Sequence, residues 1–306
     1  GGSGAPAAQN FYMNGIGLSG TAYYSSTVPT RTGYTFAGWV CRENGISVSA
    51  GEAIPNGWGS HTLVAQWTVN SYTLTVNPNG GSWNSATSNS SFTLAYGGTK
   101  TIANPTRTGY AFAGWTVSGS GSLSGTTYTQ GAGNCTLTAK WTVNNYTLTV
   151  NPNGGSWDGK TSNSTFTIAY GSTKAIANPT RTGYTFAGWT VSGSGSISGT
   201  TYTQGAGNCT LTAKWTANAV NYTVRHWKMN LSGSGYTEDT ASRQTLTANA
   251  DSTVTLANLK KSFTGFTYKE GKVGNTVKTT ATVLPDGSLV IDLYYTRNQY
   301  TVTVNK

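Results

Sequence analysis

An eleven-residue phrase that occurs three times constrains the fold of this chain more than any other feature. The phrase "PTRTGYTFAGW" begins at Pro29, returns at Pro105 with Ala111 in place of threonine, and returns unchanged at Pro179. The second and third copies lie 74 residues apart. A period of this size indicates tandem units near the lower limit of what folds alone, so the chain contains several small units rather than two ordinary domains.

The period and a change of sequence after Asn218 divide the chain into six segments. We expect a linker or remnant of cloning, a divergent or partial repeat, two full repeats, a further module and the start of another unit, at residues 1–19, 20–69, 71–144, 145–218, 219–297 and 298–306. The last segment is assigned because "YTVTVN" from Tyr300 repeats "YTLTVN" from Tyr72. Residues 1–19 lack that strand, which predicts a piece of a longer array.

Apolar residues alternate with polar ones through each repeat. In "YTLTV" Leu74 and Val76 share a face, and in "TLTAKW" Leu137 and Trp141 do, while threonine and lysine fill the other face. This period of two, bounded by glycine-rich and asparagine-rich turns, is typical of half-buried β-strands. No stretch shows a convincing helical period, so the sequence predicts a mainly β protein.

The repeated phrase itself predicts a turn followed by a strand with a bulge. Gly109 suits a positive φ in the turn, and Tyr110 and Phe112 then share one face of the strand. Trp115 falls on the opposite face unless one extra residue is inserted, and Gly114 is the natural place for such a bulge. The phrase recurs because each unit has to build its own aromatic core.

The composition argues against catalysis and against bound cofactors. Residues 71–144 contain no aspartate, glutamate or histidine, and the third unit adds only Asp158. General acid–base catalysis needs a titrating side chain, and metal sites need histidine, cysteine or carboxylate ligands. His226 stands alone in "RHWK" and is expected to be structural or solvated. Cys41, Cys135 and Cys209 are expected to be unpaired, packed thiols.

The net charge of +10 arises from scattered residues rather than from a basic cluster. Only Lys260 and Lys261 are adjacent, and no nucleic-acid-binding motif is present, so we expect no nucleic acid partner. No apolar run is long enough for a transmembrane helix, so we expect no membrane insertion. The glycine-rich, threonine-rich and charge-poor composition is of exported type, and we expect a monomer.

The order of motifs resembles a known family. "NPNGG", then "PTRTGYTFAGW", then "TLTAKW" is similar to the Listeria–Bacteroides repeat, of the internalin B-repeat type found in large secreted bacterial surface proteins. The resemblance implies small β-grasp-like units in an extracellular, cell-surface or cell-wall protein. The stretch from Val117 to Asn134, where that fold would place its helix, is too rich in glycine and serine to be a good one.

The segment after Asn218 resembles a different module. "YTVRHW", the "DGS" turn and "YYTRN" are similar to the mucin-binding-protein-like module of surface adhesins, which also implies a β-grasp-like fold.

Two functions remain open at this point. The array is either a stalk that presents a binding domain outside this sequence, or an adhesin that binds mucin, other acidic glycans or host surface proteins. Trp83 and Trp157, in polar "NGGSW" tips, are candidates for stacking on a sugar, with Arg107 and Arg181 as further candidate ligand-binding residues. The alternative is that each tryptophan folds back onto its own unit.

Overall fold

The computed structural model describes residues 26–53 and 61–304. The expected linker at 1–19 therefore lies outside the described residues. The chain divides into two compact parts, Gly1–Asn144 and Asn145–Lys306, which are described in turn. Helical structure in the described residues is limited to two short 3-10 turns, so the prediction of a mainly β protein is confirmed.

The described residues of the first repeat form an antiparallel three-stranded sheet in the order β2-β1-β3. Its strands are β1 (Tyr34–Cys41), β2 (Ser47–Val48) and β3 (Leu63–Val69). Trp39 and Val48 are the buried centre of this small unit, and Phe36 packs against them.

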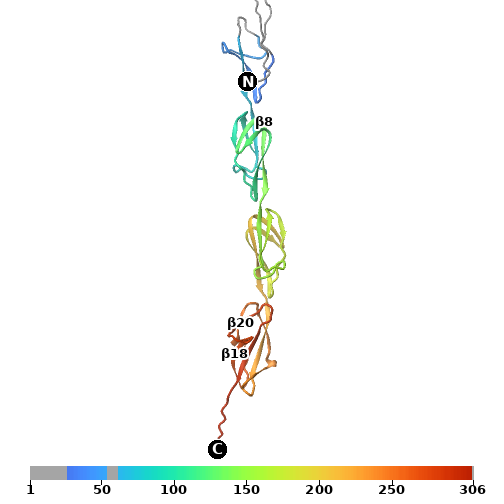
Figure 1. Cartoon of the computed structure of the whole chain (residues 1–306), viewed down its shortest axis with the longest axis vertical. Helices are drawn as coiled ribbons and strands as arrows, with labels where there is room; N and C mark the ends of the chain where they lie inside the picture. Colours follow the sequence, from blue (N-terminus) through green and yellow to red (C-terminus); the bar gives the residue numbers. More distant parts are fainter. Residues whose placement is uncertain (1–25, 54–60, 305–306) are drawn as a thin grey trace, which may run out of the picture. The chain divides into compact units, whose positions relative to one another are not determined.

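The second repeat has a mixed sheet in the order β5-β4-β8-β6, and β7 also pairs with β8. Figure 1 labels β8 in this repeat. Its strands are β4 (Ser71–Asn77), β5 (Ser90–Ala95), β6 (Thr99–Thr101), β7 (Tyr110–Ser124) and β8 (Thr127–Val143). The first strand, β4, runs parallel to the last strand, β8, with Leu74 opposite Cys135. The stretch from Val117 to Asn134, which the sequence marked as a poor helix, belongs to the long β7–β8 hairpin.

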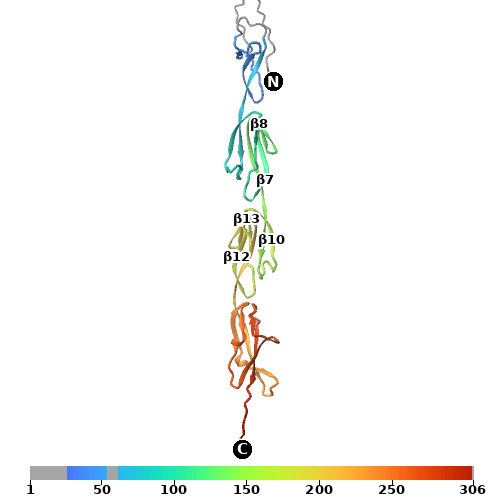
Figure 2. The ribbon, with the colours of Figure 1, turned by 90° about the vertical axis from the view of Figure 1, so that its left-hand side faces the viewer.

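The third repeat has the same strand order, β10-β9-β13-β11, with β12 paired to β13. Figure 2 labels β10, β12 and β13 in this repeat. Its strands are β9 (Asn145–Asn151), β10 (Ser164–Ala169), β11 (Thr173–Ala175), β12 (Tyr184–Ser198) and β13 (Thr201–Ala217). The first and last strands are again parallel, with Leu148 opposite Cys209.

The terminal module (219–297) has a six-stranded sheet, β15-β14-β21-β18-β19 with β16 on β14, and a separate β17–β20 pair. Its elements are β14 (Ala219–Met229), β15 (Tyr236–Glu238), η1 (Thr240–Ser242), β16 (Gln244–Asn249), β17 (Thr253–Thr255), η2 (Leu256–Leu259), β18 (Phe266–Val273), β19 (Thr276–Val277), β20 (Thr280–Thr282) and β21 (Val290–Arg297). The first strand, β14, and the last, β21, are parallel neighbours, as in the repeats.

The predicted bulge lies where the sequence placed it. The register between β7 and β8 shifts between Phe112 and Gly114, and Gly114 has a φ of 109°. The rings of Phe112 and Trp115 consequently lie on one side, with their centroids 5.4 Å apart. The ring of Tyr110 carries the guanidinium of Arg107.

Each repeat with a full sheet has its own core. In the second repeat the buried residues include Leu74, Val76 and Leu137, with Trp115 packed against them at partial exposure. The third repeat repeats this core, and the terminal module has a third one. The three cysteines are free and buried, so the prediction that they are packed thiols is confirmed.

The terminal module shares a backbone hydrogen-bond pattern with the repeats. The Tyr96 N–H donates to the Asn70 carbonyl, and the Ala250 N–H donates to the Asn218 carbonyl in the same way. The next residue is Gly97 in the second repeat (φ 75°) and Asp251 in the module (φ 60°). Both positions follow the second strand of the unit, so Asp251 occupies the place of a repeat glycine.

Candidate functional site

The turns at the start of the repeated phrase have the same geometry in all three copies. In these arginine turns, residues 31–34, 107–110 and 181–184, the tyrosine N–H donates to the arginine carbonyl at 3.0 to 3.1 Å. The glycine at the third position has a φ of 73 to 78°. A β-turn with positive φ at its third residue requires glycine there, which accounts for Gly33, Gly109 and Gly183.

Each arginine turn also stacks its charge on its own tyrosine. The guanidinium carbon lies 3.8 Å from the ring centroid in the Arg31–Tyr34 pair, 4.0 Å for Arg107 and 3.8 Å for Arg181. Arg107 additionally donates to the Asn79 carbonyl at 3.2 Å. The two arginines predicted to bind a ligand are therefore held by contacts within their own repeat, which order their side chains.

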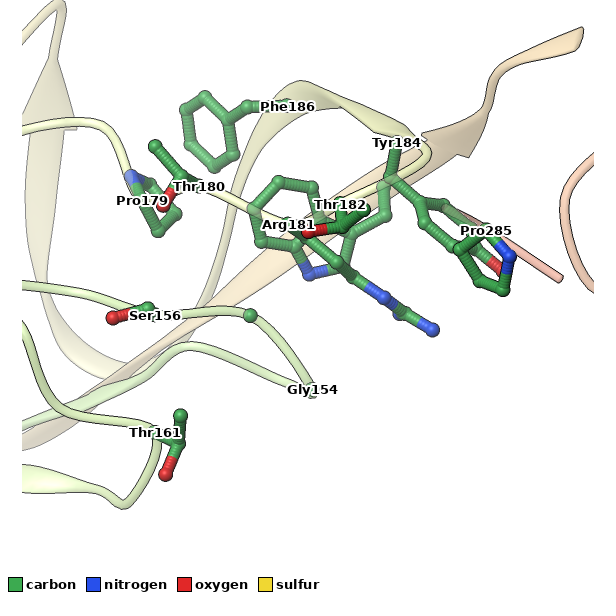
Figure 3. Close-up of a pocket in the computed structure, with 12 residues that line it drawn as sticks. Gly154, Ser156, Thr161, Pro179, Thr180, Arg181, Thr182, Tyr184, Phe186 and Pro285 are labelled. Carbon is green, nitrogen blue, oxygen red and sulfur yellow. The ribbon is translucent and has the colours of Figure 1, made fainter. Parts of the chain in front are cut away.

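An open cleft of about 800 Å³ lies beside Arg181. Figure 3 shows the guanidinium of Arg181 extending along the cleft, with Tyr184 next to Pro285 and with Ser156 and Thr161 on the opposite side. The lining residues are Gly154, Gly155, Ser156, Thr161, Pro179, Thr180, Arg181, Thr182, Tyr184, Phe186, Trp215 and Pro285. The cleft combines aromatic surface, hydroxyl groups and one cation, a combination suited to non-covalent recognition.

The floor of the cleft depends on a glycine. A Cβ atom on Gly155 would lie 2.4 Å from the Trp215 ring and 2.6 Å from the Thr180 carbonyl. Trp215 donates from Nε1 to the carbonyls of Pro152 and Asn153, both at 3.1 Å. The "NGG" turn thus lies flat against the tryptophan only because it has no side chain at its second glycine.

Arg181 and Tyr184 also contact an acidic residue of the terminal module. Arg181 Nη2 lies 3.5 Å from Asp251 Oδ2, and the Tyr184 hydroxyl donates to the same carboxylate oxygen. This hydrogen bond raises the pKa of Tyr184, because it favours the neutral phenol. Asp251 was not among the ligand-binding candidates predicted from the sequence. The missed signal was an acidic residue at the position of the glycine in "YGG".

The proposed sugar-stacking role of Trp83 and Trp157 is wrong in its assumption of exposure. The two side chains are only 3% and 7% exposed and belong to the cores of their repeats. Trp83 Nε1 donates to the Ala103 carbonyl at 2.8 Å, and its ring meets Phe92 edge-on. A bridge between Ser82 and Thr106 folds the tip back, so the alternative that each tryptophan returns to its own unit is confirmed.

Histidine 226 is structural. It is fully buried, with Nδ1 3.0 Å from the Tyr295 hydroxyl and Nε2 3.2 Å from Gln244 Oε1. The Lys261 N–H donates to the same tyrosine hydroxyl, which leaves the Tyr295 proton for Nδ1. Burial lowers the pKa of His226, so the neutral form is favoured.

Groups that could hold a metal do not gather in the described part of the chain. Residues 26–53 and 61–304 contain no cluster of three or more histidine, cysteine or carboxylate side chains. The described helical turns are also too short to cross a membrane.

Comparison with known proteins shows similarity to repeat-containing and membrane-named proteins. A family model described as the Listeria-Bacteroides repeat domain matches residues 8–66, 72–140 and 146–214. A protein of Evansella cellulosilytica named "Putative membrane protein" is 30% identical over 226 residues, which are 64% of this chain and 31% of that relative. A "Putative Gly-rich membrane protein" of the same organism is 30% identical over 140 residues, 42% of this chain and 16% of the relative. The matched region thus spans less than a third of either relative.

The three family matches coincide with the three copies of the repeated phrase and end at residue 214, before the terminal module. Together they cover more than half of the chain. This protein therefore belongs to the Listeria-Bacteroides repeat family.

Proposed function

We propose that this chain is a non-catalytic spacer of a bacterial surface protein, and that its units resist stretching between their ends. The observation that carries the proposal is the parallel pairing of first and last strands in the second repeat, the third repeat and the terminal module. Parallel neighbours place the start of the first strand and the end of the last strand at opposite ends of the sheet. Tension along the chain then loads their hydrogen bonds together, in shear.

The residues between units support the same function. Asn70 is the single residue between β3 and β4, and Asn218 is the single residue between β13 and β14. The Asn70 N–H donates to the Gly33 carbonyl at 2.9 Å, and its own carbonyl accepts from Tyr96. The Thr35 hydroxyl donates to Asn70 Oδ1 at 2.6 Å. A linker of one residue that is held by hydrogen bonds does not have the random-coil flexibility of a glycine–serine linker.

The Asn218 linker repeats these contacts in the second part of the chain. Its N–H donates to the Gly183 carbonyl, its carbonyl accepts from Ala250, and the Thr185 hydroxyl donates to its Oδ1. Gly265 and Asn298 form the corresponding backbone bond at the end of the terminal module. The same three residue types, glycine, threonine and asparagine, thus form the hydrogen bonds at the end of a repeat and at the end of the module.

The strand order also supports a relationship to the β-grasp fold. An antiparallel partner of the first strand, the first strand, the last strand and an antiparallel partner of the last strand lie in that order in β5-β4-β8-β7 and in β16-β14-β21-β18. We infer a β-grasp-like arrangement in which β-structure replaces the helix. The assignment of the terminal module as mucin-binding-protein-like belongs to this proposal as well.

Adhesion is the second candidate, favoured by the cleft beside Arg181. Its aromatic and hydroxyl lining is of the kind that binds sugars, and the positive charge of the chain favours acidic glycans such as those of mucin. Surface plasmon resonance of the whole chain on immobilised mucin tests it, with Trp215→Ala as the cleft variant and Trp141→Ala in the second repeat as its control. Equal binding by the wild type and the Trp215→Ala variant would remove the cleft from consideration.

Force spectroscopy on two variants of the second repeat tests the spacer proposal. Val76 lies in β4, on the path of the force, whereas Leu123 lies in β7, off that path, and both contribute to one core. We expect Val76→Ala to lower the rupture force of the second repeat. Leu123→Ala should lower the free energy of unfolding and leave the rupture force within error.

The two variants are matched because each removes apolar atoms from the same core. Rupture under force depends on the unfolding rate along the loaded path rather than on total stability. Equal loss of rupture force in both variants would show that shear of β4 against β8 does not limit stretching, and the proposal would fail.

A further inference from the structure

Within each of the two compact parts of the chain, the arginine turn of one unit meets the following unit. At the first, a Cβ atom on Gly33 would lie 2.2 Å from the Tyr96 ring, so that ring lies directly on the glycine. Tyr34 meets the same ring edge-on at 5.9 Å. On the side of the second repeat, this contact is made by an uncharged aromatic ring.

The second contact, between the third repeat and the terminal module, uses different chemistry. A Cβ atom on Gly183 would lie 2.6 Å from Pro285, which therefore covers the turn as Tyr96 covers the first one. Asp251 adds a carboxylate that accepts the Tyr184 hydroxyl and lies 3.5 Å from Arg181. The receiving surface of the module is thus a proline next to an acid.

Asp251 is placed for this contact by its backbone. Its φ of 60° is uncommon for a residue with a side chain and is tolerated best by glycine, asparagine and aspartate. The repeats have Gly97 and Gly171 here, both with positive φ. The module keeps the repeat conformation and adds a carboxylate that points at the arginine turn.

The exposure of the ion pair determines how strong it can be. The side chains of Arg181 and Asp251 are 28% and 49% exposed. Solvent and salt screen such a pair, and exposed pairs of this kind contribute modestly. Its effect is therefore on the orientation of the module rather than on the folding of either unit.

We propose that Asp251 and Pro285 form a docking surface of the terminal module that holds a preceding repeat carrying an arginine turn. Asp251 makes this junction sensitive to salt, whereas the junction at Asn70 lacks the charge and is insensitive. The partner that fits the surface is a unit with arginine and tyrosine at the first and fourth turn positions. The inference rests on the proposed spacer function and names which junction residues limit its bending.

Amide hydrogen exchange on the full chain, followed by NMR, tests the docking surface. The reporters are the Asn218 and Ala250 amides, whose acceptors are Gly183 and Asn218. The Asn70 and Tyr96 amides make the same bonds at the uncharged junction and serve as internal controls. Raising the salt from low to about 0.5 M should speed exchange at Asn218 and Ala250 about two- to five-fold, the range expected for an exposed ion pair, and leave the controls unchanged.

Two substitutions of Asp251 separate charge from backbone strain. Asp251→Asn keeps the shape and the tolerance of a positive φ, and Asp251→Gly restores the residue of the repeats. Both should reproduce the effect of salt and remove further salt dependence, while the Val224 amide in the module core stays protected. Arg181→Gln, which removes the other charge of the pair, should act on the two reporters as the Asp251 variants do. Arg107→Gln, in the second repeat, is its matched control and should leave both reporters unchanged.

Salt-independent exchange at Asn218 and Ala250, or equal changes at Asn70 and Tyr96, would overturn the docking surface. Failure of the spacer proposal is a different outcome. In that case the Asn70 and Asn218 amides would both exchange at the rate of unstructured chain in the wild type, at every salt concentration.

Discussion

The repeats and the terminal module share strand order and junction bonds, yet the outer faces of their sheets differ completely. In the second repeat Thr75, Thr136 and Ser118 lie side by side across three strands. In the module the corresponding positions hold Arg225, Asp292 and Lys272. One backbone framework thus accepts either a row of small hydroxyl side chains or a row of charged ones.

The charged row of the module is a connected polar network. Asp292 accepts two hydrogen bonds from Arg225, at 2.7 and 2.8 Å, and one from Trp227 Nε1 at 2.7 Å. Its side chain is 7% exposed, although it stands on the outer face of the sheet. The rings of Trp227 and Tyr294 lie nearly parallel beside it. The module face is thus covered by its own side chains, whereas in the repeat Thr75 and Thr136 are half-buried and Ser118 is exposed.

The largest effect should come from the tryptophan that folds back in each repeat. Trp83→Ala removes a buried indole and its hydrogen bond, so we expect the second repeat to lose about 3 to 5 kcal/mol. A unit of this size has little stability to spare. Chemical denaturation monitored by hydrogen exchange should show the second repeat unfolding first while the third repeat, with Trp157, keeps its stability. If the Trp83→Ala variant kept the full stability of the second repeat, the placement of Trp83 in the core would be wrong.

Breaking the charged row of the module should have the next largest effect. Asp292→Ala leaves Arg225 and the indole of Trp227 without their shared acceptor, and we expect a loss of about 1 to 3 kcal/mol, since Arg225 is partly exposed. Thr136→Ala, at the matching position of the second repeat, should change stability by less than about 0.5 kcal/mol. Urea denaturation of both variants makes the comparison. Similar losses would mean that the two faces contribute alike.

An alanine substitution at the bulge should cost more stability in a repeat than in the module. Gly114 has open space around it but a φ of 109°, so Gly114→Ala should cost about 1 to 2 kcal/mol through backbone strain alone. The module makes its bulge around Lys269, which has no positive φ. Lys269→Ala should cost less than about 0.5 kcal/mol. Thermal unfolding of the two variants checks this, and a costly Lys269→Ala would remove the distinction.

The pH dependence should be the smallest difference between the module and the repeats. Burial lowers the pKa of His226 below its ordinary value of 6.5, so the unfolded chain binds the proton first. The stability of the module should then fall by about 1 kcal/mol as the pH drops from 7 to 5.5. Residues 71–218 contain no histidine, so the two full repeats should change little.

The charged groups near His226 are Lys261, Lys228 and Asp239, and the two lysines also oppose its protonation. His226→Gln should remove the pH dependence of the module between pH 7 and 5.5. Denaturation curves at the two pH values provide the measurement. A module that becomes more stable on acidification over this range would contradict the assignment of a neutral histidine.

The sequence predicted the strands and bulges well because these depend on local pattern. Period-two alternation identified the strands, and the parity of Trp115 against Phe112 located the bulge at Gly114 before any contact was known. It could not be predicted in this way that the Trp83 side chain points back into the core of its own repeat. This orientation depends on a bridge between Ser82 and Thr106, which lie far apart in sequence.

The candidate site was predicted only in part for the same reason. Arg181 was identified from its place in the repeated phrase, but its partner Asp251 comes from another unit. The role of Asp251 follows only from a comparison of the backbone hydrogen bonds of the module with those of the repeats. In that comparison Asp251 occupies the position of a repeat glycine. The contact between Arg181 and Asp251 depends on tertiary placement and has no periodic signal in the sequence.

Stretching the wild-type chain from its two ends by single-molecule force spectroscopy tests the central claim most directly. Each full repeat and the module has its own core and its own parallel pair of end strands, so we predict a separate rupture for each of them. The two full repeats should give equal gains in length. The module, with six aligned parallel pairs against four in each full repeat, should rupture at the highest force. A single cooperative rupture, or extension of all units at low force without distinct steps, would contradict the account.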